Sequence, residues 1–148
     1  MHKLVVLLAV IAAVTGASTA QASAPTTTPV PGIDFVDTAC GCPITIQVLS
    51  TETARTFSNG VTLVTGRLVW IASANGKTVT LHVSGPAKIV IASDGSATLF
   101  GFGVGVGDFM TANGPAVLEV AGPVVIPLDG SLPPVQGRVL LNLCDALA

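Results

Sequence analysis

Few side chains in this sequence could act as a nucleophile activated by a base. His82 is the only histidine after residue 2, and it lies in a segment of alternating polarity that also holds Thr80 and Ser84. A serine hydrolase needs a serine beside a histidine that a carboxylate orients. On one strand face, Ser84 would project parallel to His82, and the sequence has no G-x-S-x-G turn. We therefore interpret His82 as a solvent-facing strand residue.

The carboxylates do not show the pairing that glycoside hydrolysis requires. Asp34 and Asp37 are close in sequence, whereas Asp94, Asp108 and Asp129 stand near predicted turns, where aspartate bonds its own backbone. Asp108, which follows a glycine-rich run, and Glu119, in an apolar segment, are with His82 the residues to inspect first if the fold contains a pocket. The alternation of polar and apolar residues is equally compatible with Glu119 on the outer face of its strand. We assign no catalytic, cofactor-binding or metal-binding residue.

Residues 1–22 have the parts of a secretory signal peptide. His2 and Lys3 supply a positive start, residues 4–14 form an uninterrupted apolar run, and residues 15–24 are small and polar. The run has eleven residues, whereas a membrane-spanning helix needs about 18 to 20. No later segment reaches that length without Gly, Pro or charge, so no transmembrane anchor is expected in the mature chain.

Two A-x-A cleavage sites compete, one ending at Ala22 and one at Ala24. Cleavage at the second would leave Pro25 directly after the cut, where its fixed φ fits an extended protease-bound strand poorly. We therefore predict cleavage after Ala22 and a secreted, extracellular product. The following residues 23–32 hold three prolines and three threonines and are predicted to form a flexible leader, with the domain proper at 33–148.

Three cysteines, Cys40, Cys42 and Cys144, would enter an oxidising compartment, where a disulfide is the default. A bridge between Cys40 and Cys42 would close a strained ring, because only Gly41 separates them. One of the two is therefore predicted to pair with Cys144, and the residues alone leave open which one. The closed loop of roughly a hundred residues would contribute about 4 to 5 kcal/mol on the chain-entropy model. Three thiols without a nearby histidine make a poor zinc site.

The polarity of the mature chain has a period of two, which predicts strands rather than helices. Clear examples are residues 44–49 and 78–84, and shorter β-branched runs occupy 87–92, 116–120 and 135–143. Turn dipeptides separate these runs, among them Asn59-Gly60, Asn75-Gly76 and Asp94-Gly95, which suit type I′ hairpins. The sequence therefore predicts an all-β domain of about seven to nine antiparallel strands with meander-like hairpins, forming a small barrel or a sandwich.

Gly101, Gly103, Gly105 and Gly107 alternate with apolar residues before Asp108. In a regular strand the four glycines would share one face. The favoured interpretation is geometric, because glycine relieves crowding where a sheet coils sharply or another layer packs closely. The alternative is a groove floor at which a ligand contacts the backbone. The spacing does not match a dinucleotide fingerprint.

Composition narrows the range of partners. After removal of the signal peptide, five basic and eight acidic residues remain, a net charge of −3. So small and evenly spread a charge argues against nucleic acid as a partner. Aromatic residues make up only 4%, with Trp70 the one tryptophan and no tyrosine, so stacking platforms for sugars or bases are poorly supported.

Several short motifs carry a resemblance to a known group. They are Cys40-Gly41-x-Pro43-Ile44, Asn75-Gly76-Lys77-Thr78, Ser84-Gly85-Pro86, Asp94-Gly95-Ser96 and Leu143-Cys144-Asp145-Ala146-Leu147. On these motifs, which span most of the mature domain, the chain resembles small secreted actinobacterial proteins of unknown function. The resemblance implies a β-rich, exported product and no particular activity. That group usually has a large apolar residue where this chain has Cys42, which implies that Cys40 pairs with Cys144 and Cys42 is the additional thiol.

Three hypotheses of function follow from these observations. The first is a non-catalytic module that binds a small apolar ligand, an envelope component or another protein, since apolar pockets need few polar groups. The second is a self-associating structural surface protein, because short β-rich chains expose strand edges. The third is a barrel enzyme of isomerase or cyclase type. A large cavity would favour the first or third, and a filled interior would count against both. No cofactor is expected in any of them.

Overall fold

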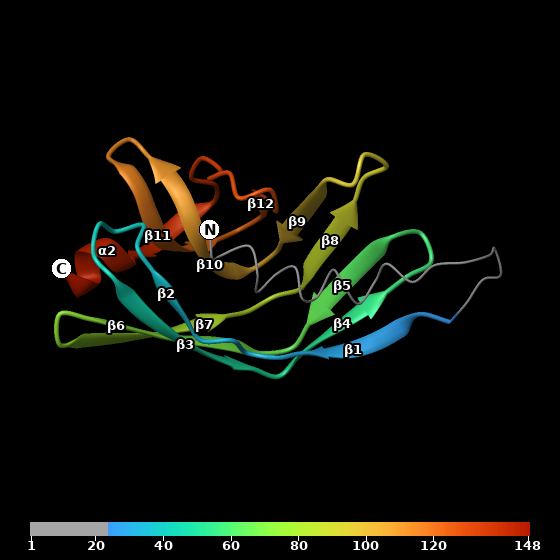
Figure 1. Cartoon of the computed structure of the whole chain (residues 1–148), viewed down its shortest axis with the longest axis horizontal. Coiled ribbons are helices and arrows are strands. Elements are labelled where there is room, and N and C mark those ends of the chain that lie inside the picture. The colour runs from blue at the N-terminus through green and yellow to red at the C-terminus, as the bar shows by residue number, and fades with distance from the viewer. Residues whose placement is uncertain (1–23) are drawn as a thin grey trace.

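Thirteen strands and one short helix form within residues 24–148, the part of the chain that the computed structural model describes (Figure 1). In chain order they are β1 (Thr26–Val30), β2 (Phe35–Asp37), β3 (Ile44–Ser50), β4 (Glu52–Thr56), β5 (Val61–Thr65), β6 (Leu68–Ala74), β7 (Lys77–Val83), β8 (Ala87–Ile91), β9 (Ala97–Gly101), β10 (Val104–Thr111), β11 (Gly114–Ala121), β12 (Val124–Pro127), β13 (Arg138–Asn142) and α2 (Leu143–Leu147). The predicted signal peptide and its cleavage site at Ala22 lie outside the described residues.

The strands form three sheets in which every strand pair is antiparallel. Their orders are β1-β4-β5-β8-β9-β12, β2-β3-β6-β7 and β10-β11-β13. The predicted all-β, antiparallel architecture is confirmed at this level. Within residues 24–148, no strand pairing closes a sheet into a barrel.

Five long strands bend, and each bend carries the chain from one sheet into another. They are β3 with β4, β5 with β6, β7 with β8, β9 with β10, and β11 with β12, each separated by one to three residues. Neighbouring long strands pair on both sides of most bends; for example, β6 pairs with β7 and β5 pairs with β8. The structure therefore has more strands than the seven to nine predicted, largely because the bends divide long strands in two.

The central bends require glycine. Gly85 and Gly103 have φ values of 111° and 105°, a region that other residues rarely adopt. A Cβ on Gly85 would stand 1.7 Å from the carbonyl oxygen of Phe102, and one on Gly103 would stand 2.2 Å from that of Ser84. This close approach lets Ser84 and Val104 exchange two backbone hydrogen bonds, of 2.9 and 2.7 Å, so neighbouring strands remain connected across the bend.

The predicted turn dipeptides all join hairpin strands, but only one matches the type I′ expectation. Asn75 and Gly76, between β6 and β7, have φ values of 51° and 74°. In Asn59-Gly60 and Asp94-Gly95 only the glycine has a positive φ. The connections there are longer than two residues, and such loops commonly need a single left-handed position.

The segment predicted to be a flexible leader contains a strand. β1 pairs with β4 in a continuous register from Thr26↔Thr56 to Val30↔Glu52. Pro29 is compatible with this pairing because β1 is an edge strand, which needs hydrogen bonds on one side only. The Ser50 hydroxyl also donates to the Val30 carbonyl, at 2.7 Å. The ordered domain therefore begins at β1 rather than at residue 33.

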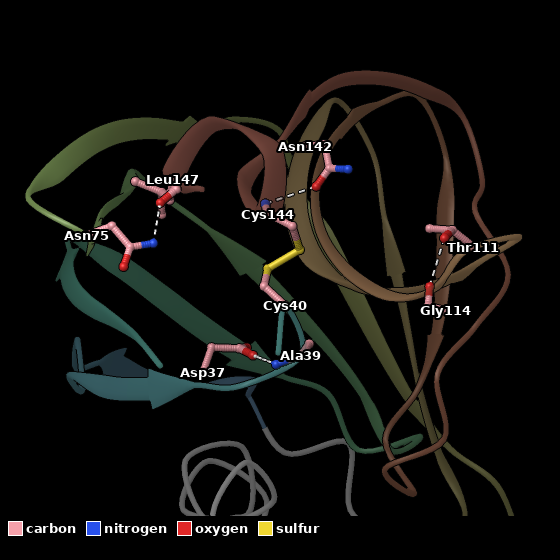
Figure 2. The surroundings of a disulfide bond; sticks show 9 residues. All are labelled: Asp37, Ala39, Cys40, Asn75, Thr111, Gly114, Asn142, Cys144 and Leu147. Carbon is pink, nitrogen blue, oxygen red and sulfur yellow. Dashed lines mark hydrogen bonds between the residues drawn. A yellow bond between two sulfur atoms is a disulfide. The ribbon is translucent and has the colours of Figure 1, made fainter. Parts of the chain in front are cut away.

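The four-stranded and three-stranded sheets pack on each other around the main core cluster, which α2 completes. Its buried members are Ile44, Ile46, Ala72, Leu81, Val117, Leu143 and Leu147. A disulfide between Cys40 and Cys144, 104 residues apart in sequence, holds the turn after β2 to α2 (Figure 2). The predicted disulfide is confirmed, with the pairing that the resemblance implies, and Cys42 is a free thiol partly buried against the main core cluster.

Candidate ligand-binding cavity

A cavity of about 810 Å³ lies between the sheets and is lined by residues of all three. Most of the lining is aliphatic, aromatic or glycine. Its largest contribution comes from the inner face of the six-stranded sheet, the curved sheet of β1, β4, β5, β8, β9 and β12 (Figure 1). The cavity is partly open to solvent rather than enclosed in the interior.

Strand register explains why that inner face is apolar. Val64, Ala87, Gly101 and Val124 form one row across β5, β8, β9 and β12. Ile89, Leu99 and Ile126 form the next row. Since side chains alternate along each strand, intervening residues such as Lys88 project from the outer face, where its Nζ lies 5.2 Å from the centre of the Phe100 ring.

Two aromatic residues line the cavity from the four-stranded sheet. Phe35 in β2 and Trp70 in β6 meet edge to face, with ring centroids 5.3 Å apart and an interplanar angle of 82°. Both rings also pack against the main core cluster. Their positions are thereby held by the close-packed part of the molecule, while one side of each is available to the cavity.

Three carboxylates, those of Asp37, Glu52 and Asp108, are the ionisable groups in the described lining, which contains no Lys, Arg or His. Asp37 is 2% exposed, and its Oδ1 accepts a hydrogen bond of 2.7 Å from the backbone N–H of Ala39 (Figure 2). Burial raises the pKa of the half-buried Glu52 carboxyl, because desolvation disfavours its charged form. Asp108 is partly buried in β10, opposite Val117 of β11.

The glycine-rich run makes a bend in the sheet and also forms part of the cavity wall. Gly103 makes the bend, and Gly101, Gly105 and Gly107 line the cavity. A Cβ on Gly105 would meet no atom within 4 Å, so this glycine faces open space. The strict alternation is interrupted at Gly103, because its positive φ breaks the extended strand into β9 and β10.

Of the three residues singled out from the sequence, Asp108 lines the cavity and the other two do not. His82 is exposed in β7, paired opposite Val69, which agrees with its interpretation as a solvent-facing residue. Glu119 is partly buried in β11, between Val106 of β10 and Leu141 of β13. The structure therefore does not bring His82, Asp108 and Glu119 together at one site.

Sequence reasoning missed Phe35, Trp70 and Glu52, and it treated Asp37 only as a neighbour of Asp34. Two signals were available. Phe35 and Asp37 are two residues apart, the spacing that places both on one strand face. Trp70 is the single tryptophan and lies in a mostly apolar run, residues 68–72. Neither signal indicates which other strand lies opposite, so the site could not be assembled from them.

Two of the turn aspartates have the structural role expected of them. Asp94 accepts a 2.9 Å hydrogen bond from the Ser96 N–H, and Asp129 accepts 2.8 and 2.6 Å bonds from the N–H and hydroxyl of Ser131. Hydrogen bonds from Ser96 and Ser131 lower the pKa of Asp94 and Asp129, respectively, because they stabilise the charged form. Both carboxylates therefore stabilise turns.

A smaller hollow of about 390 Å³ lies beside the disulfide, between the turn after β2 and the start of α2. Polar groups there are already engaged locally: Asn142 accepts from the Cys144 N–H at 3.0 Å, and the Thr111 hydroxyl donates to the Gly114 carbonyl at 2.8 Å (Figure 2). These hydrogen bonds cap α2 and close the hairpin of β10 and β11, so the larger cavity is the better candidate site.

Residues 24–148 contain no group of three or more His, Cys, Asp or Glu placed to hold a metal ion. No helix in the same residues is long and apolar enough to cross a membrane. Comparisons of the chain with protein-family models, with curated proteins and with solved structures found no match.

Proposed function

We propose that this chain is a secreted, non-catalytic module that binds a small apolar ligand in the cavity of about 810 Å³. The observation that carries the proposal is the combination of that volume with a lining that is apolar apart from a few carboxylates and a serine. Ligand sites of proteins typically measure about 300 to 1,000 Å³ and combine apolar walls with a few polar groups. Each methylene removed from water contributes about 0.8 kcal/mol before the costs of binding.

The proposed location outside the cell is supported by the disulfide. Disulfides persist in oxidising compartments and are rare in the cytosol. The Cys40–Cys144 disulfide also joins α2 to the turn whose backbone bonds Asp37. Reduction of this disulfide would release one side of the cavity wall, so the cavity depends on an oxidising compartment.

A direct test is binding of an uncharged naphthylamine dye that fluoresces in apolar surroundings. Gly105→Trp should abolish the signal, because its side chain would enter the open space in front of Gly105. Thr80→Trp, which adds the same side chain at an exposed position of β7, is the matched control and should bind the dye like the unaltered protein. Equal binding by folded Gly105→Trp would refute the cavity as the site.

A second candidate function is an enzyme of isomerase or cyclase type. Asp37 and Asp108 favour it, because carboxylates in an apolar cavity can act as general acids or bases. Native mass spectrometry of protein purified from the culture medium distinguishes the two candidates. A retained, unaltered ligand supports the binding module, whereas conversion of that ligand, abolished by Asp108→Asn, would support the enzyme.

A further inference from the structure

The cavity is chemically different at its two ends. One part is the aliphatic inner face of the six-stranded sheet, including Val64, Ile89, Leu99 and Ile126. The other part lies against the four-stranded sheet and contains Phe35, Trp70 and Asp37. Apart from Glu52 of β4, the first part offers only apolar contact, whereas the second combines aromatic rings with a carboxylate.

Asp108 belongs to the second part. It lies two residues after Val106 in β10, so both side chains project from the same face of that strand. Val106 packs against the main core cluster, as Phe35 and Trp70 do from the opposite sheet. Asp108 therefore faces the sheet that carries Phe35, Trp70 and Asp37, and all four residues line the cavity.

Charge at the cavity has one sign. Asp37, Glu52 and Asp108 line it, and no basic side chain does so among the described residues. Arg55, Lys77 and Lys88 lie on strands of the cavity wall but do not line the cavity. Lys88 alternates to the outer face of the sheet beside Phe100. An anionic head group would meet like charges in a partly desolvated space, where repulsion is stronger than in water.

We propose that the ligand is an amphiphile with an aliphatic tail and a cationic amine head, which rests on the proposed function. The tail lies along the aliphatic rows, and the head lies at Phe35, Trp70, Asp37 and Asp108. An ammonium group donates charge-assisted hydrogen bonds to carboxylates and is attracted to the faces of aromatic rings. Shape, charge and aromatic content thus favour the same orientation of the ligand.

The test compares three ligands with the same tail, dodecylamine, dodecanol and dodecanoate, in displacement of the uncharged dye at neutral pH and below their micelle concentrations. Dodecylamine should bind most tightly, and at least about tenfold more tightly than dodecanoate. Dodecanol should lie between them. Dodecanoate binding as tightly as dodecylamine, or dodecanol binding most tightly, would overturn the inference.

Variants locate the head group. Asp108→Asn and Trp70→Leu should each reduce the affinity for dodecylamine by about tenfold while changing that for dodecanol by less than about threefold. Glu119→Gln is the matched control, because it removes a carboxylate of the neighbouring strand that does not line the cavity. An equal loss for all three ligands in Asp108→Asn would contradict a head-group contact.

The two proposals fail in different ways. If none of the three ligands displaces the dye from the unaltered protein, the proposed apolar-ligand function is wrong. If all three displace it with equal affinity, that function survives and the cationic head group is refuted. The comparison on the unaltered protein does not depend on whether any variant folds.

Discussion

Two regions of this molecule have strands with the same alternation of polar and apolar residues. In one region the apolar face is fully buried, and in the other it borders the cavity. Where the four-stranded and three-stranded sheets meet, Ile44, Ile46, Ala72 and Val117 are 0% exposed. Along the six-stranded sheet, Leu99 and Ile126 have the same period-two placement but remain partly exposed beside the cavity. The comparison teaches that alternation selects an apolar face, while the presence of an opposing layer decides whether that face becomes a closed core or the wall of a cavity.

The largest expected effect concerns the disulfide that closes the packed region. Cys144→Ser should lower the free energy of unfolding by about 4 to 5 kcal/mol, because the loop it closes spans about a hundred residues. Denaturant unfolding measures this loss. Cys42→Ser is the control and should change stability by no more than about 1 kcal/mol, since Cys42 is unbridged and only partly buried. Equal losses in both variants would mean that the bridge does not stabilise the protein.

A pair of truncations measures the difference between core and cavity wall directly. Ile46→Ala should cost about 3 kcal/mol, because it leaves a void in a closed core. Leu99→Ala should cost about 1 kcal/mol, because its side chain already borders the cavity and buries less surface. Thermal and denaturant unfolding should agree on this order. Similar costs would indicate that the cavity is closed in solution.

The glycine-rich run offers a third test, which separates the bend from the open space. Gly103→Ala should destabilise by about 2 kcal/mol, because its φ of 105° and the Ser84 carbonyl both oppose a Cβ. Gly105→Ala should change stability by less than about 1 kcal/mol, and in the stabilising direction, because its Cβ meets nothing. If Gly105→Ala is the more damaging change, the two roles are assigned wrongly.

The smallest effect concerns the pH dependence of stability. Burial raises the pKa of Glu52 in the folded protein above its ordinary value of 4.5. The folded state therefore binds the Glu52 proton more tightly than the unfolded state does. Stability from this group is present below about pH 4.5 and is lost as pH rises through the folded pKa. Glu52→Gln should therefore flatten that decline in melting temperature. Asp34→Asn, an exposed carboxylate outside the lining, should not flatten it.

Local features of the fold were predictable because their causes are local. The strands at residues 44–49, 78–84 and 87–92 correspond to β3, β7 and β8, since alternation acts between neighbouring residues. Asn75-Gly76 forms the predicted type I′ turn because two residues with positive φ suffice for it. The prediction of a flexible leader was wrong because the cause of β1 is not local. Nothing within residues 23–32 indicates that β4 has a free edge for β1.

The sequence by itself determined the strand periodicity, the main hairpins and the need for a bridge to Cys144. Only the tertiary structure decided that Asp37, Glu52 and Asp108, from separate strands, would line one cavity with Phe35 and Trp70. The physical reason is that side-chain alternation is a property of one strand, whereas a cavity depends on where bent strands leave two faces apart. Those bends depend on close backbone contacts, such as that between Gly85 and Gly103, which exist only after distant segments have paired.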